Sequence, residues 1–331
     1  ADYAGHAYVV FGTGSGFPAS LSLSALSGSN GFALHGSSAF DYAGTSVNLV
    51  GDVNGDGIDD LAVGAPGADA GGLDRGEAYV VFGTTAGFAA NLDFSSLSGP
   101  DGFTIQGSIS SGRAGTSVNA AGDVNGDGFA DLIIGAPLAA VPGAGTAGQS
   151  YVVFGAASGL GSNLSLSALD GSNGFAIDGT DGSRTGQSVS AVGDVNGDGI
   201  DDLLVGSPSA PAYGEPGSAH VIFGTTSGFG SSVDLGQLGA TEGVTLAGID
   251  PGDVAGKAVA AAGDVDGDGL ADILVGAQLA DVGAAFNAGE AYLIFGTALA
   301  NPDATVGDAG ANDLAGTAAA DTLIDAQGND T

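Results

Sequence analysis

Four short loops rich in Asp and Gly hold the residue types best suited to chemistry in this sequence. The string Gly-Asp-Val-Asn-Gly-Asp-Gly recurs, once with Asp in place of Asn, and its first Asp stands at positions 52, 123, 194 and 264. Asp or Asn at alternate positions turns successive side-chain oxygens toward one point, and Ca²⁺ binds six to eight oxygens at about 2.3–2.6 Å. The loops therefore predict about four calcium sites.

Each loop can supply several oxygens to its ion. Side chains at positions one, three, five and nine and the backbone carbonyl at position seven provide the ligands, and Gly at position six allows the sharp turn. Mg²⁺ is the alternative ion, but it demands near-ideal octahedral geometry and keeps its waters, so a loop with this many protein oxygens favours calcium. The predicted ligands are Asp52, Asn54, Asp56, Ile58 (carbonyl) and Asp60; Asp123, Asn125, Asp127, Phe129 (carbonyl) and Asp131; Asp194, Asn196, Asp198, Ile200 (carbonyl) and Asp202; and Asp264, Asp266, Asp268, Leu270 (carbonyl) and Asp272.

Two other interpretations of these loops fit less well. An EF-hand loop needs a bidentate Glu at position twelve, where the four copies here have Val63, Ile134, Val205 and Val275. A plain hairpin turn uses Asn-Gly or Asp-Gly, but it does not require the Asp at position nine that every copy carries. Because the crowded carboxylates repel one another until an ion arrives, we expect ion binding to contribute to folding.

Composition excludes several classes of protein. The chain has 331 residues with 64 Gly, no Cys and a formal net charge of −34. The lack of Cys excludes disulfides, thiolate nucleophiles and cysteine-ligated metals, and the negative charge makes nucleic acid a poor partner. No apolar run approaches the ~18 residues of a membrane helix, so we expect no membrane insertion. The N-terminus lacks a start Met and a signal peptide, which is typical of a processed chain or a fragment.

The loops belong to a longer repeat, because the first Asp recurs at spacings of 71, 71 and 70 residues. In one unit, strand-length runs fall at 44–50 (strand A), 61–63 (strand B), 78–83 (strand C) and 102–107 (strand D), and none has a helical period. Such units predict an all-β fold, a β-propeller of about four to five four-stranded blades. A sandwich with internal duplication is the alternative.

The domain organisation follows from the repeats. We expect a propeller over 1–297, with repeats at about 13–83, 84–155, 156–224 and 225–296. Strand C occurs five times and the other strands four times. The N-terminal strand D could close the ring by completing the last A-B-C set, but we favour a window of a longer array.

The C-terminal segment 298–331 has a different pattern. Asp303, Asn312, Asp321 and Asp330 are nine residues apart. A nine-residue period with Gly, Asp and Leu in fixed phase is typical of a calcium-binding parallel β-roll. We therefore expect a linker and the start of such a roll.

At these residues the sequence resembles the FG-GAP repeats of integrin alpha-chain β-propellers and their bacterial relatives. The likeness covers residues 1 to about 297 and includes Gly-Ala-Pro at 64–66 and 135–137, although the third and fourth copies depart from it at 206–208 and 276–278. The tail resembles the nonapeptide repeats of RTX proteins, which implies type I secretion. The resemblance implies that strand A is innermost, with the A–B loops on one face and the B–C and D–A loops on the other. The departures weaken any inference of integrin-like partner binding.

All the basic residues fall on or beside the face that the resemblance places opposite the calcium loops. They are Arg75, Arg113, Arg184 and Lys257. In so acidic a chain, this segregation predicts a site for an anionic or polyhydroxylated ligand. The alternative is that each pairs with a nearby Asp, for example Arg75 with Asp74 or Asp69.

Few features of the sequence indicate a catalytic site. His6, His35 and His220 show no motif spacing, and His220 stands at the strand C position that other repeats give to Tyr, which favours packing. We therefore expect a secreted or cell-surface bacterial module, not an enzyme, that serves adhesion or binds a glycan or a surface protein. A structural spacer or a subunit of a larger assembly, including one with a second copy of the chain, is the alternative. A polysaccharide-active domain is the third hypothesis.

Overall fold

A computed structural model describes residues 2–69, 73–157, 160–209, 214–283 and 285–296. The expected β-roll segment, 298–331, lies outside these residues, so its structure stays a prediction. In the described part of the chain, no helix is long and apolar enough to span a membrane.

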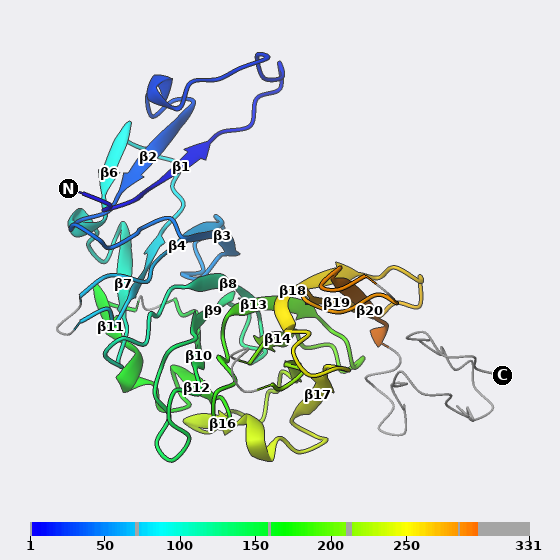
Figure 1. Ribbon diagram of the computed structural model, residues 1–331. Coiled ribbons are helices and arrows are strands. Elements are labelled where there is room, and N and C mark those ends of the chain that lie inside the picture. The colour runs from blue at the N-terminus through cyan, green and yellow to red at the C-terminus, as the bar shows by residue number, and fades with distance from the viewer. Residues whose placement is uncertain (1, 70–72, 158–159, 210–213, 284, 297–331) are drawn as a thin grey trace.

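The repeats build five sheets, which follow one another in chain order along an arc (Figure 1). Within each sheet, consecutive strands A to D pair antiparallel. Short apolar stretches between turn residues form the strands, and their side chains alternate between the two faces of the sheet. The first sheet contains β1 (His6–Val10) and β2 (Gly31–His35); the second β3 (Ser46–Gly51), β4 (Asp60–Ala65), β5 (Glu77–Val81) and β7 (Gly102–Gln106); the third β8 (Ser117–Gly122), β9 (Asp131–Ala136), β10 (Gln149–Val153) and β12 (Gly174–Asp178); the fourth β13 (Ser188–Gly193), β14 (Asp202–Ser207), β15 (Ser218–Ile222) and β17 (Gly243–Ala247); and the fifth β18 (Ala255–Gly263), β19 (Asp272–Ala277) and β20 (Glu290–Ile294).

The sheets form a β-propeller, as predicted, and not a sandwich. Each strand A contacts the strand A of the next sheet, so β3, β8, β13 and β18 line the inside of the arc. The hydrophobic cores lie between neighbouring sheets. Phe32 of the first sheet packs with Val63 and Tyr79 of the second, and all three are buried.

Three short strands were not predicted from the sequence. β6 (Asn91–Asp93), β11 (Asn163–Ser165) and β16 (Ser232–Asp234) lie in the stretch between strands C and D, where the sequence predicts no strand. Each pairs parallel with strand D of the preceding sheet. A 3-10 helix follows each strand and buries its first side chain, Phe94, Leu166 or Leu235. A further 3-10 helix spans Leu23–Ala25. Three residues are too few to show an alternating pattern, so no strand signal is visible here in the sequence.

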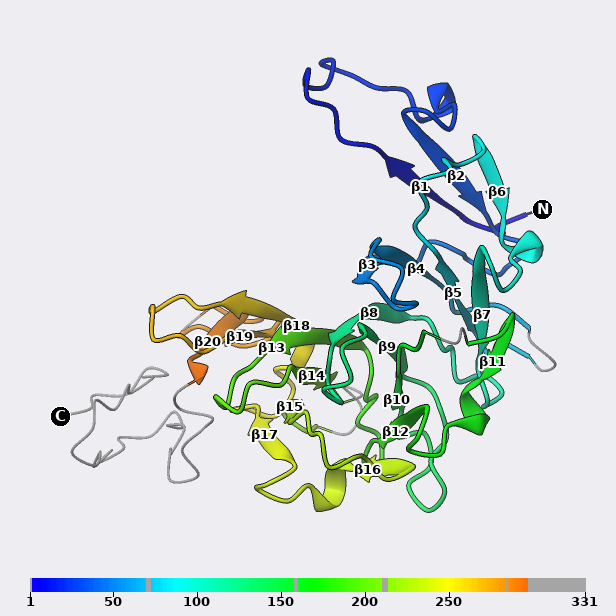
Figure 2. The ribbon, with the colours of Figure 1, turned by 180° about the vertical axis from the view of Figure 1, so that it is seen from behind.

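The two ends of the arc do not pair with each other among the described residues. β2 pairs with β1 and β6, and β20 pairs with β19. The first and last sheets lie far apart in both views (Figures 1 and 2). The closure in which the N-terminal strand D completes the last A-B-C set is therefore wrong for this structure, because that strand pairs with its own neighbour β1.

Candidate metal centres

The A–B loops share one backbone conformation, which the first Asp holds in place. In the first loop, Asp52 Oδ1 accepts hydrogen bonds from the N–H groups of Gly55 and Asp56 at 2.7 and 3.0 Å, and its Oδ2 accepts one from Gly57 at 2.7 Å. Gly55 and Gly57 have φ of 76° and 86°, in the left-handed region that favours Gly. Asp194 and Asp264 each accept the same three bonds from their own loops.

The third and fifth positions continue this pattern. Asn54 Oδ1 accepts from the N–H of Asp56 at 2.8 Å, and Asp56 Oδ1 accepts from the N–H of Ile58 at 2.9 Å. Carboxylate oxygens that accept such bonds keep further lone pairs for a cation. The side-chain oxygens at positions one, three and five thus all point toward the backbone of their own loop. This arrangement fits a cation site.

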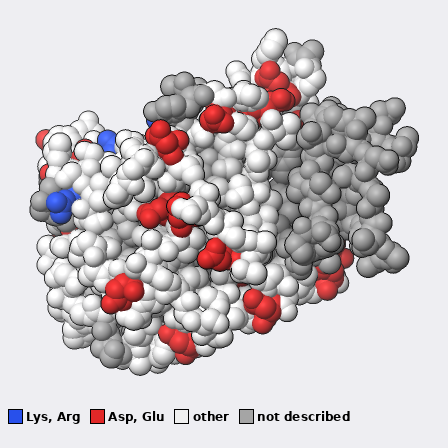
Figure 3. Space-filling view, turned by 90° about the horizontal axis from the view of Figure 1, so that it is seen from below, with Lys and Arg blue, Asp and Glu red and all other residues white. Residues whose placement is uncertain are grey.

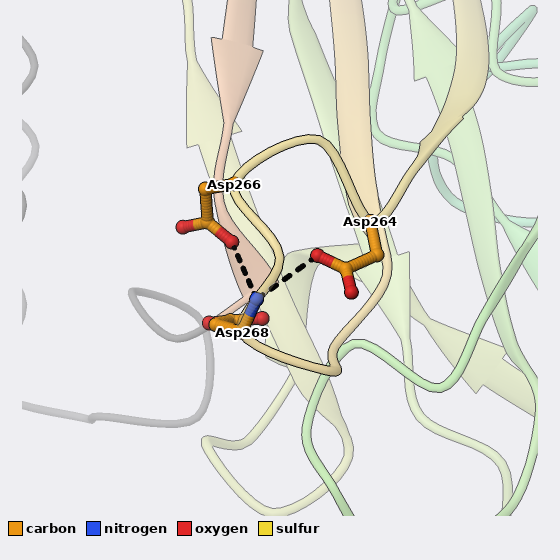
Figure 4. A group of neighbouring side chains, drawn as sticks. All are labelled: Asp264, Asp266 and Asp268. Atoms are coloured by element: carbon orange, nitrogen blue, oxygen red, sulfur yellow. Dashed lines mark hydrogen bonds between the residues drawn. The ribbon is translucent and has the colours of Figure 1, made fainter.

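The fourth loop carries three carboxylates together. Oxygens of Asp264, Asp266 and Asp268 lie within 4.8 Å of one another, and all three residues are exposed (Figure 4). Among the described residues, no other group of three acidic or His side chains is so placed. The other loops have Asn at the middle position, so an amide oxygen replaces one carboxylate.

The Asp at position nine is buried and ties the loop to strand C. Asp60 is completely buried; its Oδ2 accepts from the N–H of Val53 at 3.0 Å and its Oδ1 from that of Gly83 at 2.8 Å. The same two bonds recur in every copy. The equivalent residues are Asp131, Asp202 and Asp272, which are also completely buried. Position nine therefore has a structural role that the sequence did not reveal, beside its predicted role as a ligand.

Burial makes these carboxyl groups unusual. It raises the pKa of Asp60 to about 6, that of Asp202 to about 7 and that of Asp131 to about 8, even though the two backbone hydrogen bonds oppose the shift. The first and fifth carboxylates of the same loop raise the pKa further. A divalent cation would cancel both effects, because it favours the ionised form. The loops thus combine oxygen donors with a local excess of negative charge, which fits a hard divalent cation.

The predicted carbonyl ligands Ile58, Phe129, Ile200 and Leu270 follow the Gly turn of each loop. Their contact with an ion stays a prediction.

The basic residues lie at the end of the sheets opposite the A–B loops. The N–H of Arg113 donates to Asp74 O at 3.2 Å, and the N–H of Ala114 donates to Arg75 O at 2.9 Å, so a D–A loop and a B–C loop meet there. Arg113 and Arg184 occupy equivalent positions with φ of 58° and 56°.

None of the four basic side chains pairs with a carboxylate within 4.0 Å in the described part of the chain. The alternative that Arg75 pairs with Asp74 or Asp69 is therefore wrong, and its buried Nε has no hydrogen-bond partner. On the face drawn in Figure 3, carboxylates are spread over the surface, whereas Lys and Arg appear toward one edge only.

His220 packs in the interior, as predicted. It is 6% exposed, and its ring nitrogens contact Ser218 Oγ and Thr245 Oγ1 at 3.0 Å each. Burial lowers the pKa of His220 to about 4. His6 and His35, which show no motif spacing, face each other across two strands at 2.8 Å, a contact that no local pattern in the sequence could reveal.

Fold and loops together define a β-propeller-type repeat protein with cation-binding geometry between strands A and B. Comparison with known families agrees: residues 43–81, 114–153, 185–222 and 255–294 each match the model described as FG-GAP repeat. Four segments of the chain therefore match the FG-GAP repeat, and each spans strands A to C.

Relatives of this chain include a phospholipase D and integrin alpha chains. The chain is 34% identical over 188 residues to phosphatidylinositol-glycan-specific phospholipase D of Bos taurus, which covers 56% of this chain and 21% of that protein. It is 30% identical over 258 residues to integrin alpha-V of Gallus gallus (76% of this chain, 22% of that protein), and 30% identical over 261 residues to integrin alpha pat-2 of Caenorhabditis briggsae (73% and 18%). The chain spans about a fifth of the length of these relatives.

Proposed function

We propose that the chain is a calcium-binding β-propeller module of a large secreted or cell-surface bacterial protein, where it serves adhesion or ligand binding. One observation carries the proposal: the same loop geometry recurs between strands A and B, with oxygen donors and a buried carboxylate whose pKa is raised in the absence of an ion. Four Ca²⁺ ions, one per loop, would neutralise this charge.

Two features of the predicted sites support an extracellular location. The fifth ligand of every loop is exposed, and the first and third ligands are half-buried in three loops and exposed in the fourth, so solvent reaches each loop. Extracellular calcium modules bind their ions at about 10⁻⁴–10⁻³ M, which suits the calcium concentrations outside cells. The resemblance of segment 298–331 to RTX repeats leads us to propose type I secretion.

We place the ligand site on the face opposite the ions. Arg75, Arg113, Arg184 and Lys257 are the cations available there, and none of them pairs with a carboxylate in the described residues. Unpaired guanidinium groups suit anionic or polyhydroxylated ligands, because their planar donors bind two oxygens at once. A glycan or a glycan-bearing surface protein is the partner class we favour.

We propose that the chain is not an enzyme. Its relatives include a phospholipase D, but the aligned segment covers only about a fifth of that protein. A structural spacer is the second candidate, and the near-identical bonding of the four loops favours it, since a recognition site usually needs loops that differ.

The test is a glycan and matrix-polymer array, probed with the chain in millimolar Ca²⁺ and again in EGTA. Binding of a defined sugar class that depends on calcium and falls in an Arg113→Ala, Arg184→Ala double variant would support the adhesion module. No binding by a folded, calcium-loaded chain would favour the spacer. A melting curve that EGTA leaves unchanged would refute the calcium sites themselves.

A further inference from the structure

Two of the three His residues of the chain meet on the first sheet. His6 of β1 and His35 of β2 are register partners, and their Nδ1 atoms are 2.8 Å apart. The rings are nearly perpendicular, at 84°, with centroids 4.7 Å apart. His6 is exposed and His35 is half-buried, so solvent reaches the pair. Both strands lie in the blue part of the ribbon near the N-terminus (Figure 1).

A third side chain orients one of these rings. His35 Nε2 is 3.0 Å from Asn91 Oδ1 on β6, and an amide oxygen can only accept, so Nε2 carries the proton. The Nδ1 atom of His35 is then a bare lone pair, and His6 Nδ1–H donates to it. When His6 carries its proton on Nε2 instead, the Nδ1 lone pairs of both rings are free to bind one cation. An oxygen that accepts from the other ring nitrogen, as Asn91 Oδ1 does from His35, is typical of metal-ligating His residues.

The separation of the two nitrogens matches a common coordination geometry. Two imidazole nitrogens at 2.0–2.1 Å from one ion lie about 2.9 Å apart at a right angle and about 3.4 Å apart at a tetrahedral angle. The observed 2.8 Å corresponds to neighbouring positions of a square-planar or octahedral site. Both rings are in contact with solvent, so small rotations of the rings are possible. Such rotations would point both Nδ1 lone pairs at the ion.

The repeat architecture does not require this pair. The equivalent register partners are Glu77 and Gln106 in the second sheet, Gln149 and Asp178 in the third, and Ser218 and Ala247 in the fourth. Gln149 donates a hydrogen bond to Asp178 at 2.5 Å, which shows that side chains at these positions touch. Two imidazoles are found there only in the first of these sheets, although His is rare in the chain.

We propose that His6 and His35 chelate one divalent first-row transition-metal ion, with Cu²⁺ preferred. Imidazole nitrogens suit such ions, and Cu²⁺ binds most tightly among them, whereas the Asp loops offer only oxygen to a hard cation. His220 cannot compete, because it is buried with both ring nitrogens in contact. Solvent completes the coordination sphere, and Asp93, the register partner of His35 on β6, adds negative charge nearby.

The experiment titrates Cu²⁺ and, separately, Ni²⁺ into the chain in millimolar Ca²⁺, which occupies the Asp loops. Calorimetry gives the stoichiometry and affinity, and electron paramagnetic resonance counts the nitrogen donors to Cu²⁺. The test variant is His6→Gln with His35→Gln, because Gln occupies the first position in the third sheet and the second position in the second sheet. His220→Gln is the matched control, and Asn91→Ala tests the orienting contact.

We expect one Cu²⁺ with two nitrogen donors, an affinity unchanged in His220→Gln, and loss of that site in the double variant. Asn91→Ala should weaken binding about tenfold, as second-shell changes do. Equal affinity in the double variant, or a Cu²⁺ signal with oxygen donors only, would overturn the proposal. Because nitrogen donors and their loss in the double variant identify the His site, these outcomes do not depend on whether the Asp loops bind calcium.

Discussion

At the scale of single residues, the Asp at position nine of each loop has two roles that place opposite demands on its charge. Asp131 is completely buried, and its two side-chain oxygens accept hydrogen bonds from the N–H groups of Val124 and Gly155. These bonds hold the loop against strand C. Burial raises its pKa to about 8, so near neutral pH and without a cation the carboxyl group is largely protonated. A bound ion would let it ionise in place.

This shift predicts an unusual pH dependence. The pKa of Asp131 in the folded chain, about 8, lies above the ordinary value of 3.8, so its contribution is full below that value and is lost as the pH rises toward 8. Calcium-free protein should therefore lose about 2 kcal/mol between pH 6.5 and 8. Urea unfolding at several pH values measures this. The loss should vanish in saturating Ca²⁺; its persistence there would show that no ion reaches Asp131.

His220 predicts the opposite trend at lower pH. Its pKa is lowered to about 4 by burial, below the ordinary 6.5, so the stability it contributes is present above pH 6.5 and is lost as the pH falls toward 4. That loss should reach about 3 kcal/mol. His220→Tyr, which introduces the residue of the other repeats, should remove it, and Tyr151→His should introduce a similar loss in the third sheet. Denaturant midpoints at pH 7 and 4 compare the three proteins; parallel curves would contradict the prediction.

At the scale of elements, the first and fifth Asp side chains of the first A–B loop accept hydrogen bonds from N–H groups of that same loop. Asp56→Ala removes a predicted ligand of the first site only, so it should abolish or weaken that site and leave the others nearly intact. Calcium calorimetry would show one ion fewer per chain. Ser15→Ala, at an exposed position far from the loops in sequence, serves as the control. Loss of all sites at once would show that the loops are coupled.

The short strands couple one sheet to the next. Phe94, which begins the 3-10 helix after β6, is 1% exposed and stacks on Tyr79 at a centroid distance of 4.1 Å. Phe94→Ala should cost about 3–5 kcal/mol. The loss should be local, so hydrogen exchange should quicken in β1, β2 and β6 while β13–β15 stay protected. Phe17→Ala, at a 59% exposed Phe, is the control. Uniform faster exchange would mean that the propeller unfolds as one unit.

At the scale of the whole molecule, the excess of negative charge opposes the compact state. The net charge is −34, so the calcium-free chain repels itself, and salt screens that repulsion over about 10 Å at 0.1 M. We expect the melting temperature of the calcium-free protein to rise with NaCl concentration. The rise should be smaller in saturating Ca²⁺. Calorimetric scans over a salt series measure both, and identical slopes in the two states would contradict the prediction.

The sequence predicted features that repeat and missed those that depend on contacts across sheets. The four loops and the strands A to D could be predicted because each recurs at the same place in every repeat, at a spacing of 70 or 71 residues. The parallel strand β6 escaped notice because three residues carry no period. The pairing of His6 with His35 also escaped notice, since the residues are 29 positions apart and only the register of β1 and β2 joins them.

The way strands are shared between sheets also bears on how such a chain can evolve. The repeat at about 84–155 gives its strand D, β7, to the second sheet and its short strand, β6, to the first sheet, so hydrogen bonds cross the repeat boundaries. A gene duplication that copies one whole repeat keeps the strand pairing at each internal junction, because the same edges recur at every repeat boundary. A deletion of part of a repeat exposes edges in two neighbouring sheets. Selection should therefore preserve repeat length strictly while the number of repeats varies among descendants.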